Sequence, residues 1–229
     1  HPFGTQRDVY EPGHEWVSSS INAGEPAEEK PRISIGEGQC DQPYEASIFN
    51  ISAMSFGSLS PTAIEAMNKG AARGGFLHNT GEGGLSPYHL EYGADLTFQL
   101  GTAYFGCRTS EGRFDPGDFE SITTHPEVKM TEVKLSQGAK PGHGGVLPGE
   151  KVSEEIADIR GIPPGEDIVS PPSHAEFSSP RGLLEFLDRL RDLSGGKPVG
   201  FKFCPGQHAE FLSICKAMAS TGRRPDFIT

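Results

Sequence analysis

Apolar side chains recur along the chain with two periods, a helical one near 3.6 residues and a strand-like one of 2. The helical period is strongest in 180–196, where the apolar face consists of Leu183, Leu184, Leu187, Leu190 and Leu193. Ser179 and Pro180 have the chemistry of a helix start, and Gly195 has that of a helix end. This stretch is therefore predicted to be the best-defined helix.

The same patterns predict the elements of the rest of the chain. Strands are predicted at 46–54, 76–84, 96–106, 128–136, 198–203 and 225–229. Helices are predicted at 58–75, 150–161, 180–196 and 207–222, the first of them capped by Ser60 with Pro61 at its first position. From residue 128 onward strand and helix alternate, which is typical of a parallel sheet with crossover helices. The sequence therefore predicts an α/β fold, either an unclosed barrel or part of an open doubly wound sheet.

The chain divides by composition into two regions. Residues 1–45 are polar and irregular, and we expect this N-terminal segment to pack on the barrel. Residues 46–229 hold the predicted strands and helices. The chain begins with His1 and stops as a strand begins, so we expect a piece of a longer polypeptide.

Composition and charge narrow the class of protein. The formal net charge is −11 and Lys and Arg form no stripe, which argues against a nucleic-acid partner. Neither a signal peptide nor an apolar run of membrane-spanning length is seen, so we expect a cytoplasmic protein, with an upstream membrane anchor left open. The cysteines form no C-x-x-C pair, and no metal site is predicted.

Glycine is concentrated directly behind the predicted strands. Four stretches show this: "AMSFGS", "NTGEGG", "SQGAKPGHGG" and "FCPG". Ligands of parallel α/β proteins bind beyond the carboxyl ends of the strands, where glycine lets backbone approach a flat or phosphate-bearing ligand. The alternative for any one loop is a tight turn. No stretch matches a dinucleotide-binding fingerprint or a P-loop.

Two charged residues stand out in this setting. Lys202 alternates with Phe201 and Phe203, so its side chain should lie on the opposite face of the strand from theirs. An ammonium there could stabilise a reduced cofactor or hold a substrate carboxylate, the alternative being an edge lysine in solvent. Glu82 lies between glycines, and is either solvated or an anchor for a cationic or amide group.

Several motifs together resemble the FMN-binding domain of glutamate synthases, in particular the bacterial stand-alone type that lacks the glutaminase domain. The motifs are "SAMSFGSLS", "NTGEGG", "KLSQGAKPGHGGVLPG", "VSPPSHAEFSSP" and "FKF". The resemblance implies a TIM (β/α)₈ barrel, present here as about its first six strands. It also implies a flavoprotein oxidoreductase in which FMN passes electrons to 2-iminoglutarate, formed from 2-oxoglutarate and ammonia. The electron donor stays unidentified, and the oligomeric state stays open, a homo-oligomer included.

The resemblance assigns roles to individual residues. Ala53, Met54 and Ser55 would line the flavin, and Gln137 would hydrogen-bond its edge. Lys202 would lie near both flavin and substrate, and Glu82 beside the substrate, which makes these two the expected catalytic residues. The FMN phosphate site and any iron–sulfur cluster would belong to the C-terminal strands that are missing here.

One departure from the family pattern raises alternatives. Tyr104 takes the place of an arginine that would hold a substrate carboxylate, and Arg108 or Arg113 would have to compensate. The substrate can then be 2-oxoglutarate or a related molecule. A non-catalytic structural or regulatory barrel, or a half-barrel completed by a partner chain, is the rival hypothesis. A flavin barrel acting on 2-hydroxy acids is weaker, because no histidine has the context of the required base.

Overall fold

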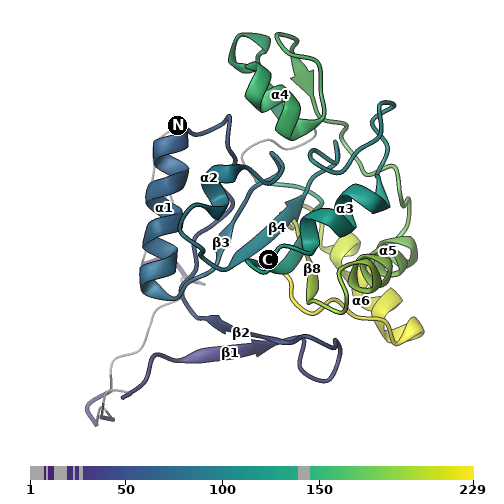
Figure 1. The fold of residues 1–229 in the computed structure, drawn as a ribbon. Coiled ribbons are helices and arrows are strands. Elements are labelled where there is room, and N and C mark those ends of the chain that lie inside the picture. Colours follow the sequence, from purple (N-terminus) through teal and green to yellow (C-terminus); the bar gives the residue numbers. More distant parts are fainter. Residues whose placement is uncertain (1–7, 9, 13–19, 23, 26–27, 139–144) are drawn as a thin grey trace. The chain divides into compact units, whose positions relative to one another are not determined.

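The computed structural model describes residues 8, 10–12, 20–22, 24–25, 28–138 and 145–229 (Figure 1). The chain separates into a first unit, His1–Pro31, and a second unit, Arg32–Thr229. Every helix and strand named below belongs to the second unit. Among the described residues, no helix combines the length and apolar character needed to cross a membrane.

A parallel sheet forms the centre of the second unit. Its strands, in spatial order, are β3 (His78–Asn79), β4 (Leu96–Leu100), β5 (Val128–Lys134) and β8 (Val199–Lys202). Single parallel bridges extend both edges, Ile51 to His78 on one side and Ile228 to Phe201 on the other. The predicted α/β fold with a parallel sheet is confirmed. The sheet does not close into a barrel within the described residues, so the barrel itself is not seen.

The strand predicted at 46–54 is wrong. Instead β2 (Tyr44–Ser47) pairs antiparallel with β1 (Arg32–Ile35). The segment that follows meets the parallel sheet at Ile51, through its bridge to His78, and at Met54, through a backbone bond to Asn79. The connection between β1 and β2 begins with Gly36 at φ +84°, a left-handed conformation that favours glycine. A hairpin therefore replaces the irregular backbone expected toward residue 45.

The helices follow their sequence signals closely. α1 (Pro61–Gly74) starts at Ser60, whose hydroxyl accepts from the Ala63 N–H, and α5 (Pro180–Leu193) starts at Ser179 in the same way. The other predicted helices are α4 (Glu154–Arg160) and α6 (His208–Thr221). Two short helices, α2 (Pro87–Leu90) and α3 (Pro116–Thr123), were not predicted. Their few turns hold too few apolar positions to show a period.

Helices cover one face of the sheet, and both polar and apolar side chains line a cavity on the other. α1 lies against β3, α3 against β5, α5 against β8 and α6 against α5 (Figure 1). The leucine face of α5 is buried in this layer with Phe98 and Phe201. Burial of each such side chain stabilises the fold by about 1.5–3 kcal/mol. The opposite face carries Asn79, Glu132 and Lys202, which line a cavity of about 320 Å³.

Two buried histidines lie between the sheet and its helices. His78 of β3 and His89 of α2 are fully buried, with ring centroids 5.2 Å apart. The ring nitrogens of His78 have no hydrogen-bond partner among the described residues, whereas those of His89 contact the Ser86 hydroxyl and the Met54 carbonyl. Burial lowers the pKa of each histidine from 6.5 to about 4.

Acid should therefore destabilise the fold through these two side chains. Between pH 6.5 and pH 4 the unfolded chain binds protons that the folded chain excludes. Stability is thus complete above pH 6.5 and falls with pH by about 1.4 kcal/mol per pH unit for each histidine. Urea unfolding of the full-length protein at several pH values should show this slope, and His78→Phe should remove about half of it. An unchanged slope in His78→Phe would contradict the assignment.

Candidate functional site

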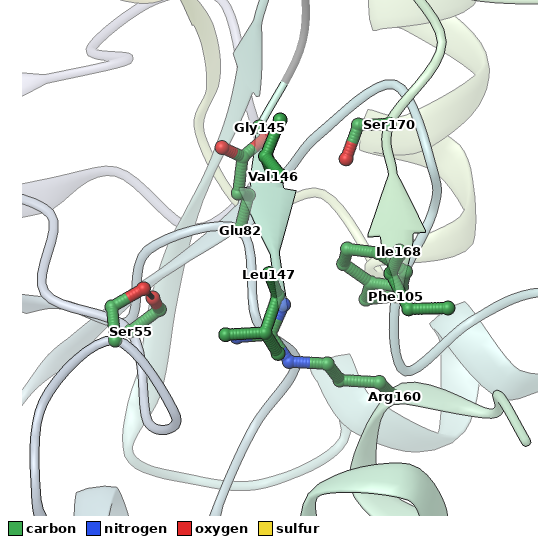
Figure 2. A pocket seen from close by; sticks show the side chains of 10 residues that line it. Ser55, Glu82, Phe105, Gly145, Val146, Leu147, Arg160, Ile168 and Ser170 are labelled. Atoms are coloured by element: carbon green, nitrogen blue, oxygen red, sulfur yellow. Dashed lines mark hydrogen bonds between the residues drawn. The ribbon is translucent and has the colours of Figure 1, made fainter. Parts of the chain in front are cut away.

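A small pocket lies beyond the carboxyl ends of the strands (Figure 2). It encloses about 60 Å³, room for a few water molecules. Its lining comes from the loops after Ile51, β3 and β4, from α4, and from the ribbon of β6 (Val146–Leu147) and β7 (Ile168–Val169). The residues that line it are Ser55, Ser58, Glu82, Phe105, Gly145, Val146, Leu147, Arg160, Ile168 and Ser170. This is the edge of a parallel α/β sheet at which active sites form.

Glu82 forms the central ion pair of this pocket. Its Oε1 accepts a hydrogen bond of 2.5 Å from Nζ of Lys134, the last residue of β5, and both side chains are largely buried. Neighbouring glycines leave space for the carboxylate: a Cβ at Gly101 would overlap Oε2, and one at Gly145 would lie 3.1 Å from Oε1. Of the two alternatives for Glu82, the structure supports the anchor for a cationic group.

Arg160 is a second buried cation in the same pocket, and the sequence analysis did not identify it. The residue is 4% exposed, and its guanidinium lies 5.0 Å from the centroid of the Phe105 ring. Nη2 donates to the Phe56 carbonyl at 2.9 Å, whereas Nε has no partner among the described residues. Burial lowers the pKa of Arg160, and the charge of Glu82 opposes that effect. A buried guanidinium with spare donors is suited to an anionic ligand.

The two expected catalytic residues line different cavities. Glu82 lines the small pocket, whereas Lys202 lines the 320 Å³ cavity together with Ala53. Lys202 forms no ion pair within the part of the chain that the structure describes. Its neighbour in the register of β5 and β8 is Lys134, the residue that pairs with Glu82. The prediction that the Lys202 side chain lies opposite Phe201 is confirmed.

The residues expected to contact a flavin are spread over the same edge. Ser55 lines the small pocket, where its hydroxyl donates to Ser58 Oγ at 2.8 Å. The backbone of Met54 bonds to Asn79 and to the His89 ring. Gln137 is half-buried in the loop after β5. Residues 139–144 of that loop lie outside the described residues.

Two glycines of the "NTGEGG" loop make room for neighbouring protein. A Cβ on Gly81 would lie 2.7 Å from the Ser55 nitrogen, and one on Gly83 would lie 2.9 Å from Arg160 Nη2. At these positions glycine lets the loop pack against the chain that follows Ile51. At these two positions the neighbour is protein, and the hypothesis that the glycine loops admit a ligand stays a prediction.

Tyr104 does not occupy a substrate position. It is fully buried in the apolar layer, and its hydroxyl bonds to the 174–176 loop. Arg108 lies 5.7 Å from the Phe105 ring, but the arginine that lines the pocket is Arg160. Tyr104 thus makes structural contacts here, and the expected loss of an arginine contact to the substrate stays a prediction.

Comparison of the sequence with known proteins identifies the family that it matches. Residues 20–229 match the family described as "Conserved region in glutamate synthase". The glutamate synthase large subunit-like protein YerD of Bacillus subtilis (strain 168) is 46% identical over 197 residues, which are 85% of this chain and 37% of YerD.

Two archaeal-type relatives are more distant. The archaeal-type glutamate synthase [NADPH] of Thermotoga maritima is 37% identical over 151 residues, 66% of this chain and 27% of that protein. The archaeal glutamate synthase [NADPH] of Archaeoglobus fulgidus is 36% identical over 190 residues, 77% of this chain and 35% of that protein. The chain therefore spans about a third of the length of these relatives.

Proposed function

Because the chain belongs to the glutamate synthase family, we propose that it forms part of the FMN-binding (β/α)₈ barrel of a glutamate synthase-type oxidoreductase. The proposed reaction is the reductive amination of 2-oxoglutarate, or of a related keto acid, by ammonia. The observation that carries the proposal is the buried set of charges formed by Glu82, Lys134 and Arg160 at the carboxyl edge of the sheet.

The pocket residues support distinct tasks on a keto acid. Arg160 would bind a substrate carboxylate, because it is buried and its Nε has no acceptor among the residues that the structure describes. Glu82 would hold the ammonia-derived nitrogen, and its hydrogen bond from Lys134 Nζ would orient that carboxylate. A purely structural or regulatory barrel would have no use for such a costly burial of charge at this edge.

The cavity of about 320 Å³, on the sheet face opposite the helices, supports the proposal that a flavin binds here. Lys202, whose ammonium has no ion-pair partner among the described residues, lines a cavity that Ala53 also lines, which suits a ring that becomes anionic on reduction. When bound, FMN supplies the hydride that converts the imine into the amine. Lys202 would stabilise the negative charge, while Gln137 and Ser55 would orient the edge of the ring. We propose that the phosphate site, any iron–sulfur cluster and the electron donor belong to parts other than this chain. We also propose that the protein is cytoplasmic.

A visible absorption spectrum tests this proposal. The full-length protein should carry a flavin band that is bleached by a reductant and recovers on adding 2-oxoglutarate with ammonia. Lys202→Met should retain the fold but lower the flavin midpoint potential, because the anionic reduced ring loses its cation. A full-length protein that binds no flavin, even after incubation with FMN, would reject the assignment.

A further inference from the structure

Tyr104 is held in an unusual conformation by the loop that its hydroxyl contacts. Its φ is +53°, a left-handed conformation that is rare for a bulky side chain and persists only where the surroundings enforce it. The hydroxyl oxygen accepts from the backbone N–H groups of Ala175 at 3.1 Å and Glu176 at 3.3 Å. These two bonds occupy the lone pairs of the oxygen. The phenolic proton is therefore free to point at the third neighbour, His174 Nδ1, which lies 3.2 Å away.

This donor fixes the tautomer of His174. If Nδ1 accepts the phenolic proton, the ring hydrogen must reside on Nε2. Nε2 lies 2.9 Å from the carbonyl oxygen of Lys134 and donates to it. The ring is 6% exposed and stacks on Phe177 at a centroid distance of 5.0 Å. His174 is thus a neutral, oriented donor rather than a solvent-facing base.

The carbonyl that receives this bond belongs to the lysine that pairs with Glu82. The backbone of Lys134 ends β5, and its ammonium is 2.5 Å from Glu82 Oε1. An unbroken series of contacts therefore leads from the strained backbone of Tyr104 through the His174 ring to the pocket carboxylate. Neither Tyr104 nor His174 lines the pocket itself.

We propose that Tyr104 and His174 are positioning residues that fix the end of β5 and thereby hold the Lys134–Glu82 pair in its working geometry. The inference rests on the function proposed above for Glu82 and Lys134. Its consequence is that the pocket works only while His174 is neutral. A protonated Nδ1 would be a donor that faces the Tyr104 hydroxyl. That oxygen already accepts from the N–H groups of Ala175 and Glu176, so it has no lone pair left for a third donor.

The surroundings of His174 act on its protonation in opposite directions. Burial lowers its pKa, while the carbonyl of Lys134 and the charges of Glu82 and Glu176 raise it. The phenol of Tyr104 donates to the neutral ring and so works with burial. Removal of that donor should therefore let His174 take up a proton at higher pH.

Histidine NMR of the full-length protein, labelled with ¹⁵N in histidine and with ¹³C at the glutamate carboxyl, tests the geometry without any need for turnover. His174 should show the Nε2–H tautomer, and Tyr104→Phe should raise its titration midpoint by about half to one pH unit. The Glu82 carboxyl signal should shift in the same pH range in both proteins. Exposed His125 provides the control, because His125→Gln should change neither signal. A Glu82 signal that ignores the titration of His174 would overturn the inference.

Turnover measurements on His174 variants then distinguish a positioning role from simple structural support. His174→Gln keeps a donor for the Lys134 carbonyl and does not titrate, so it should retain activity and lose the acid limb of the pH profile. His174→Leu should lose activity about tenfold or more at every pH. Equal activity in His174→Leu and wild type, or an acid limb that persists in His174→Gln, would overturn the inference. A wild-type protein without turnover would count against the proposed function alone, and the NMR result would still decide the positioning role.

Discussion

Lys134→Met in the full-length protein is expected to lower turnover by about 100-fold or more, the range found when one preorganised donor is removed from an active site. The methionine side chain fills the space but removes the cation 2.5 Å from Glu82 Oε1. The carboxylate would then be confined by Gly101 and Gly145 without its ammonium partner. Its orientation toward the substrate would no longer be fixed by a charged partner.

Two further variants separate chemistry from folding. Lys134→Met combined with Glu82→Gln removes both charges, so stability should recover while turnover stays low. Lys129→Met is the matched control, because Lys129 lies on the same strand but forms a half-exposed pair with Asp95 at 3.6 Å. Steady-state turnover and urea unfolding of all three proteins measure the outcome. Wild-type turnover in Lys134→Met would remove Lys134 from the mechanism.

Local signals explain why the helices could be predicted from the sequence. Ser60 and Ser179 cap their helices through bonds that span three residues, and Gly161 closes α4 in a left-handed conformation. The β1–β2 hairpin depends on which distant residues pair, such as Ile33 with Ala46. Alternation of apolar residues does not report the partner of a strand, so the pairing of 44–47 with 32–35 was not predicted.

The residues of the candidate site also divide into those that have a local sequence signal and those that have none. Glu82 could be found because its setting among glycines is unusual for a carboxylate. Lys134 and Lys202 have the same alternating context, and only the three-dimensional structure shows that Lys134 is the one that pairs with Glu82. Arg160 has the sequence signature of an ordinary basic residue in the last turn of a helix. Its burial against Phe105 comes from tertiary packing that no local pattern encodes.

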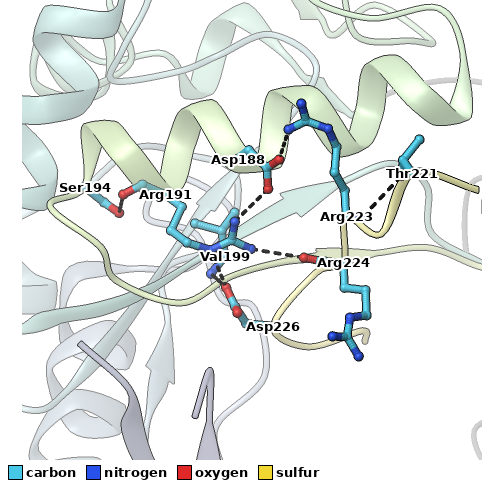
Figure 3. A network of polar contacts seen from close by, with 8 residues as sticks. All are labelled: Asp188, Arg191, Ser194, Val199, Thr221, Arg223, Arg224 and Asp226. Atoms are coloured by element: carbon cyan, nitrogen blue, oxygen red, sulfur yellow. Dashed lines mark hydrogen bonds and ion pairs between the residues drawn. The ribbon is translucent and has the colours of Figure 1, made fainter. Parts of the chain in front are cut away.

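At the opposite end of the strands, a network of ion pairs ties the last segment to the sheet (Figure 3). The side chain of Asp226 is fully buried, and its Oδ2 accepts from Arg191 Nε at 3.0 Å and from the Val199 N–H at 2.7 Å. Arg191 also pairs with Asp188 at 2.7 Å, and Asp188 contacts the exposed Arg223. One carboxylate thus joins α5, the start of β8 and the chain that precedes the Ile228 bridge.

Asp226→Ala should therefore destabilise the fold by about 3 kcal/mol or more, as expected when one partner of a buried ion pair is lost. The Val199 N–H would lose its acceptor, and Arg191 would keep the carboxylate of Asp188 and the carbonyl of Arg224. Arg223→Ala removes an exposed arm of the same network and should cost less than about 1 kcal/mol. Urea unfolding of the two full-length variants, followed by circular dichroism, measures the difference. Equal urea midpoints for the two variants would contradict the prediction, because the buried carboxylate would then contribute no more than the exposed arginine. The last segment would instead be held by its backbone bonds to Phe201.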